Sequence, residues 1–118
     1  MRIARRHLAL GLAGVLCAFA PWVWADTLTG EVVDLACYMS HPDSGHGSGH
    51  RKCAEMCIKK GLPMGLLAAD QQVYLLLEDH EDPKAYAQLK EKVAEQVTVE
   101  GKKVQQGGLT GIVVEGVK

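Results

Sequence analysis

Apolar residues follow two different periods along residues 26–118, and these periods predict five strands and two helices. Short apolar runs rich in β-branched residues, separated by glycine, proline and polar turns, are typical of strands. The predicted strands are residues 27–35, 65–69, 73–77, 97–104 and 109–117. Between the first two strands, residues 40–49 contain three glycines and no apolar residue, which indicates a loop.

The two predicted helices are marked by the residues at their ends. Residues 50–60 have helical character and stop before Gly61, with Pro63 two residues later, as helices commonly end. A second helix is predicted to begin at Asp82–Pro83, because an aspartate side chain caps a helix and proline fits its first position. The apolar face of this second helix consists of Tyr86, Leu89 and Val93, which recur at helical spacing.

The order of these elements predicts a mainly β fold of the α+β type, a five-stranded OB-like barrel. The OB fold has one helix between its third and fourth strands, which is where the helix starting at Asp82 falls. The helix at 50–60 is then an insertion between the first and second strands, at a rim where such barrels commonly place binding loops. A five-stranded α+β sandwich has the same element order and is the alternative. Residues 26–118 are predicted to form one domain.

The N-terminal residues predict an export signal. Arg2, Arg5 and Arg6 form a basic head before an apolar run at 8–20, and a cleavage point follows Ala25. We therefore expect residues 1–25 to be a signal peptide, with the general secretory (Sec) route favoured over the twin-arginine (Tat) route. The mature protein is expected to be periplasmic or secreted by a bacterium, without membrane insertion after cleavage.

Signal removal changes the charge and the cysteine count. It would leave 93 residues and shift the formal net charge from −1 to −4, with three tyrosines as the remaining aromatic residues. Such a domain lacks the cationic surface and the stacking platform that nucleic-acid binding needs, so no nucleic-acid partner is expected. Three cysteines would remain, although exported proteins normally pair their thiols. The odd number predicts a free thiol or a use other than disulfides.

Cysteine and histidine residues share one face of the predicted helix at 50–60. Cys53 and Cys57 lie four residues apart, and His50 lies three residues before Cys53. Cys37, at the end of the first predicted strand, is expected to fold back across the glycine loop and supply a third sulfur. Three thiolates and one imidazole are a donor set that tetrahedral zinc sites use. We therefore predict a metal site with Cys37, His50, Cys53 and Cys57 as ligands.

Other donors surround this set. Met39, Met56, His41 and His46 are additional candidate ligands. Because sulfur donors are soft, Cu(I) is the first ion expected as cofactor and Zn(II) the second. Asp34, which precedes Cys37 by three residues, is expected to orient a ligand from outside the coordination shell.

The sequence favours a periplasmic transition-metal-binding protein, used in copper handling or sensing or holding a structural zinc. Its expected partners are the metal ion and another periplasmic protein. The first alternative is a thiol–disulfide redox protein, because Cys53 and Cys57 are close enough on a helix for a strained, reducible disulfide. The second is a non-catalytic binding module whose cysteines staple the inserted loop. No catalytic motif such as HExxH or a phosphate-binding loop identifies a reaction.

The chain resembles small exported bacterial OB-like domains through three short motifs. The motifs are D-x-x-C-Y, H-x-x-C-A-x-x-C and G-x-P-x-G, formed here by Asp34, Cys37, Tyr38, His50, Cys53, Ala54, Cys57, Gly61, Pro63 and Gly65. This resemblance implies the fold and the export, and it implies no particular chemistry. The spacing of Cys53 and Cys57 is also similar to the copper-binding element of Sco-type copper chaperones, whose thioredoxin-like fold does not match this strand order.

Overall fold

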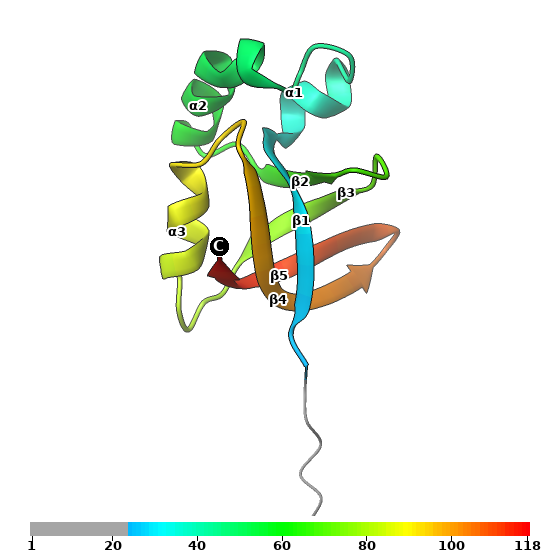
Figure 1. The fold of residues 1–118 in the computed structure, drawn as a ribbon, viewed down its shortest axis with the longest axis vertical. Helices are drawn as coiled ribbons and strands as arrows, with labels where there is room; N and C mark the ends of the chain where they lie inside the picture. The colour runs from blue at the N-terminus through cyan, green and yellow to red at the C-terminus, as the bar shows by residue number, and fades with distance from the viewer. Residues whose placement is uncertain (1–23) are drawn as a thin grey trace, which may run out of the picture.

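The computed structural model describes residues 24–118, so the predicted signal peptide lies almost entirely outside the described residues (Figure 1). The strands are β1 (Asp26–Asp34), β2 (Met64–Ala68), β3 (Val73–Glu78), β4 (Gln96–Gln106) and β5 (Leu109–Val117). The helices are α1 (Leu35–Ser40), α2 (Arg51–Lys59) and α3 (Lys84–Lys90). A single 3-10 turn, Ser48–His50, leads into α2.

The five strands close into a barrel in the order β1-β2-β3-β5-β4, and β4 pairs back onto β1. The pairing of β3 with β5 is parallel, and the other four pairings are antiparallel. With α3 between β3 and β4, this arrangement confirms the predicted OB-like fold. A register shift between Glu100 and Gly101 bends β4, so that one strand can pair with both β5 and β1.

Successive residues of each strand point alternately into the barrel and away from it. Val32 and Leu66 belong to the main core, whereas their neighbours Val33 and Leu67 belong to a second, smaller cluster. Tyr38 of α1 packs in that second cluster, so α1 covers part of the barrel wall. The helices α2 and α3 contribute Ala54, Ile58, Ala85 and Leu89 to the main core.

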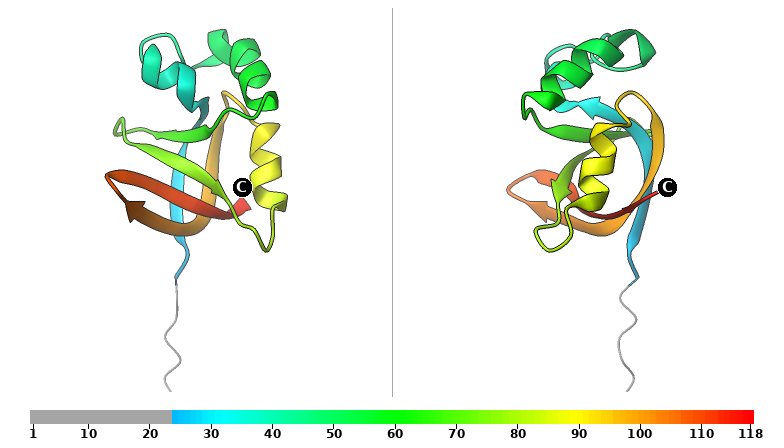
Figure 2. Two further views of the ribbon diagram at one scale, coloured as in Figure 1. Left: turned by 180° about the vertical axis from the view of Figure 1, so that it is seen from behind. Right: turned by 90° about the vertical axis from the view of Figure 1, so that its left-hand side faces the viewer.

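The segment between β1 and β2 forms a cap of two helices over one end of the barrel. Figures 1 and 2 show α1 and α2 above this end, while α3 lies along the side of the barrel. Asp34 and Met64 are the last paired residues of the β1–β2 ladder. Just beyond them, the backbone N–H of Leu35 donates a hydrogen bond to the carbonyl of Pro63 at 3.0 Å. The inserted segment therefore leaves and rejoins the barrel at one point.

The main differences from the sequence prediction lie at the ends of two elements, and α3 begins at Lys84 rather than at Asp82–Pro83. The first strand ends at Asp34 and is followed at once by α1, a helix that the pattern of apolar residues does not predict. The helix α3 ends at Lys90, before Val93, which instead bridges to Val32 of β1 and remains buried. The chain turns there because Ala94 adopts a left-handed φ of 60°, which a helix cannot continue through.

Candidate metal centre

Asp34 fixes the position of Cys37 by starting α1. Its Oδ1 accepts hydrogen bonds from the backbone N–H groups of Ala36 (3.0 Å) and Cys37 (3.3 Å), which is an N-cap. At the other end of this short helix, the N–H of His41 donates to the carbonyl of Cys37 at 2.8 Å. The expectation that Cys37 ends the first strand is therefore wrong, because the residue lies within α1.

The helix α2 presents Cys53 and Cys57 beside its buried face. Ala54 and Ile58 are buried in the core, and each cysteine immediately precedes one of them, about 100° around the helix. The helix then stops at Gly61 (φ 93°), whose N–H donates to Ile58 O while the following N–H donates to Cys57 O. These two bonds form a Schellman motif, so the C-terminal end of α2, next to Cys57, is held by backbone hydrogen bonds.

The three cysteines converge from the two helices. The Sγ atoms of Cys37, Cys53 and Cys57, here called the cysteine cluster, all lie within 4.8 Å of one another, and none is in a disulfide. A second group of donors consists of one atom each from Asp34, Cys37 and His50, again within 4.8 Å of one another. Cys37 belongs to both groups. Three cysteines and a histidine therefore lie close enough to hold a metal ion.

Two polar atoms at this site are buried without a partner. Asp34 is 0% exposed, and its Oδ2 makes no hydrogen bond of ordinary geometry. His50 Nε2 is likewise buried without a hydrogen-bond partner. Buried polar atoms in folded proteins are nearly always paired, and bound ions or waters account for many of the exceptions. Two such atoms beside three free thiols fit a bound cation.

The Asp34 carboxylate controls the protonation of the neighbouring thiols. Its hydrogen bonding to the Cys37 thiol, a weak donor, acts with burial and its negative charge to raise the pKa of Cys37 to about 12. The same interaction raises the pKa of Cys57. Burial alone would raise the pKa of Asp34, but interactions with the two thiols and two backbone amides hold it below its usual value. Without metal the carboxylate is charged and both thiols keep their protons, so metal binding must release protons.

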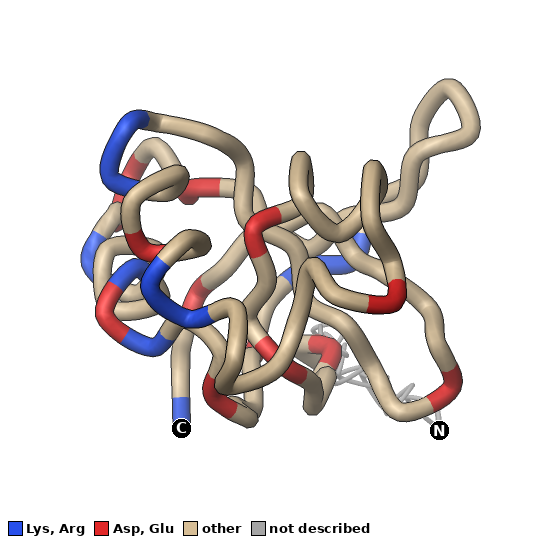
Figure 3. Tube along the Cα trace, turned by 90° about the horizontal axis from the view of Figure 1, so that it is seen from above, with Lys and Arg blue, Asp and Glu red and all other residues tan. Residues whose placement is uncertain are grey.

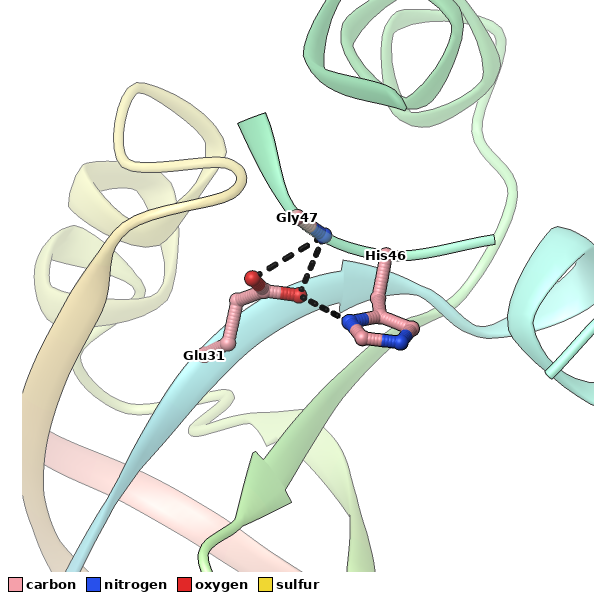
Figure 4. Close-up of polar contacts among 3 residues, drawn as sticks. All are labelled: Glu31, His46 and Gly47. Carbon is pink, nitrogen blue, oxygen red and sulfur yellow. Dashed lines mark hydrogen bonds and ion pairs between the residues drawn. The ribbon is translucent and has the colours of Figure 1, made fainter. Parts of the chain in front are cut away.

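The loop between α1 and α2 is held against the barrel by Glu31 of β1. Both carboxylate oxygens of Glu31 accept from the N–H of Gly47 at 3.0 Å, and His46 Nδ1 lies 3.8 Å from Oε2 (Figure 4). The ring of His46 also meets Tyr38 edge-on, with 5.9 Å between centroids. The glycine-rich loop is therefore fixed at both β1 and α1.

A close approach inside this loop joins it to α1. A Cβ atom added to Gly45 would lie 2.6 Å from the carbonyl oxygen of Cys37 and 2.8 Å from that of His41. A side chain at position 45 has no room unless α1 moves. Gly45 thus allows the loop to pack directly against the backbone of Cys37.

Of the additional candidate ligands, the two methionines are exposed and the two histidines lie outside the converging donors. Met39 and Met56, on α1 and α2, are 69% and 59% exposed. His41 is exposed, and His46 is held by Glu31. Neither histidine belongs to the two groups of converging donors found among residues 24–118.

The charge distribution around the barrel is mixed. Both basic residues (lysine and arginine) and acidic residues (aspartate and glutamate) occur along the described trace (Figure 3). No helix within residues 24–118 is both long enough and apolar enough to cross a bilayer.

Comparison with models of known protein families, with curated proteins and with solved structures found no match for this chain.

Sequence reasoning placed Asp34 near the cysteines but missed how central it is. The structure puts its carboxylate against Cys37 and His50, and its effect on the thiol pKa values reaches Cys57 as well. The sequence signal was present, since Asp34 stands three residues before Cys37. Its complete burial depends on the pairing of β1 with β2, which no local pattern reveals.

Proposed function

We propose that this protein binds a thiophilic transition-metal ion through the cysteine cluster, with His50 as a fourth ligand. The observation that carries this proposal is the convergence of three free Sγ atoms within 4.8 Å on two separately anchored helices. Thiolates and a neutral imidazole are ligands that both Zn(II) and Cu(I) accept. Such an ion would also supply a partner for the buried His50 Nε2.

The proposed setting is the periplasm, and the proposed role is the handling or sensing of copper, with a structural zinc as the second candidate. Support for an exchangeable ion comes from exposure, because Cys53 is exposed and two exposed methionines lie on the same helices. Soft, accessible donors of this kind suit Cu(I). Another periplasmic protein that exchanges the ion is the proposed partner.

The competing function is thiol–disulfide exchange at Cys53 and Cys57. Exchange requires a thiolate, and the raised pKa of Cys57 works against it. A metal ion overcomes the same raised pKa, because it displaces the proton from the sulfur that it binds. The raised pKa of Cys57 therefore makes this thiol a poor nucleophile unless a metal ion displaces its proton.

The test is a titration of the reduced mature protein with Zn(II) and Cu(I) against competing chelators. Cys37→Ser and His50→Ala should each weaken binding of the ion by about tenfold or more, because each removes a donor. His41→Ala is the matched control, since it removes an exposed histidine from the same insertion and should leave the affinity unchanged. Equal affinity in all four proteins would contradict the proposal. A Cys53–Cys57 redox pair would instead keep its reduction potential in Cys37→Ser.

A further inference from the structure

The Asp34 carboxylate lies beside three of the four proposed metal ligands. It lies within 4.8 Å of donor atoms from Cys37 and His50, and it interacts with the thiol of Cys57. His50, by comparison, has its donor atom in a group within 4.8 Å only with those of Cys37 and Asp34 among the described residues. The carboxylate therefore stands inside the ring of donors rather than behind one of them.

The capping role of Asp34 does not explain its second oxygen. Oδ1 accepts the two backbone N–H groups that begin α1, whereas no N–H or O–H group donates to Oδ2 although the side chain is completely buried. Asparagine and serine cap helices about as well as aspartate, so capping does not require a charge. A buried carboxylate without an opposite charge is costly, and no lysine or arginine pairs with Asp34 among the described residues.

We propose that Oδ2 of Asp34 is a direct ligand of the ion held by the cysteine cluster, and that the centre is built for a divalent ion of the zinc class rather than for Cu(I). This inference rests on the proposed metal-binding function and reverses the order of ions that the sulfur donors alone suggest. A carboxylate oxygen is an accepted ligand of Zn(II), whereas Cu(I) favours soft thiolate and thioether donors.

Charge and geometry both support the divalent ion. Three thiolates and a carboxylate carry four negative charges, and a doubly charged ion neutralises more of them in a partly buried site than Cu(I) does. Zinc–ligand bonds of about 2.0–2.3 Å hold neighbouring donors about 2.8–3.8 Å apart in four- or five-coordinate sites. The donor atoms within each group already lie within 4.8 Å of one another, and Cys37 belongs to both groups.

The test compares Asp34→Asn with the wild-type protein in three titrations, with Zn(II), Cu(I) and the spectroscopic probe Co(II). Asparagine preserves the size of the side chain and a capping oxygen while removing the charge. We expect affinity for Zn(II) and Co(II) to fall by about tenfold or more, while affinity for Cu(I) changes by less than about threefold. The ligand-field bands of Co(II) should also shift, because an oxygen ligand is lost or replaced.

A positioning role for Asp34 gives a different result. If the carboxylate orients the thiols from outside the coordination shell, Asp34→Asn lowers the affinities for Zn(II) and Cu(I) by the same factor and leaves the Co(II) bands in place. That result, or an unchanged Zn(II) affinity, overturns this inference and leaves the proposed function standing. Failure of the wild-type protein to bind either ion overturns both.

The folded state is checked on the metal-free proteins by thermal unfolding. Should Asp34→Asn not fold, Asp34→Ser provides the second variant, because serine retains a capping oxygen but carries no carboxylate. His50→Gln in the same titrations shows whether the imidazole or the carboxylate contributes more to the affinity for Zn(II). We expect the larger loss from the Asp34 variant.

Discussion

Replacement of Gly45 by alanine should separate the metal centre from the stability of the barrel. The new Cβ would meet the carbonyl oxygen and carbon of Cys37 at 2.6 and 2.7 Å, whereas ordinary contact begins at 3.4 Å. Both opposing atoms belong to the backbone, so α1 must move away by about 0.7–0.8 Å to restore contact distance. Metal–ligand distances in proteins are held to within about 0.2 Å, so this displacement is large for Cys37 as a ligand.

The expected result is a loss of metal affinity of about tenfold or more in Gly45→Ala, comparable with the loss of one donor. Chelator competition with Zn(II) measures it, and urea unfolding of the metal-free protein reports on the barrel. Gly49→Ala is the matched control, because it lies in the same loop, has no atom within 4 Å of an added Cβ and has no positive φ. Wild-type affinity in Gly45→Ala, with the loop still folded, would refute the idea that this contact positions Cys37.

Three further predictions concern stability, thiol chemistry and processing. Ile58→Ala should lower the free energy of unfolding by about 2–5 kcal/mol in urea titrations, because Ile58 anchors α2 in the core. The control Lys59→Ala, at an exposed position, should change the free energy of unfolding by less than about 0.5 kcal/mol. The Cys37 thiol, with its pKa of about 12, should be alkylated slowly at pH 9. Asp34→Asn should accelerate this alkylation, because loss of the carboxylate lowers the pKa of Cys37 and raises the fraction of thiolate. An unchanged alkylation rate at Cys37 would contradict the electrostatic argument. The intact mass of exported protein should correspond to a chain beginning at Asp26, and retention of residues 1–25 would disprove the predicted cleavage.

The barrel could be predicted because each of its strands carries its own signal. Apolar runs bounded by glycine and polar turns mark β2, β3 and β5, and Asp82–Pro83 marks the approach to α3. The end of that helix was harder to predict, because Val93 continues the apolar spacing although the chain has already left the helix. Val93 is buried by its bridge to β1 just as it would be on the apolar face of a helix.

The metal centre was predictable in composition and less so in arrangement. The helical spacing of Cys53 and Cys57 follows from local periodicity, and the structure places both on α2. The helix α1 escaped prediction because six residues are too short to show a period, and its start depends on Asp34 being held in place by the strand pairing. The contact between Gly45 and α1 is likewise tertiary, since a glycine in a polar loop reads as flexibility rather than as close packing.

The hydrogen bond from Leu35 to Pro63 has a consequence for how such a barrel can evolve. In topological terms the whole segment between these residues is the loop of one long hairpin, so a turn of about two to five residues could join β1 to β2 at the same seam. The segment between Leu35 and Pro63, which carries the cysteines and His50, could therefore be transferred to another barrel of this type. The recipient barrel would need three features. These are an acidic residue at the position of Glu31, an aspartate at the end of the first strand, and an apolar recess for Ala54 and Ile58.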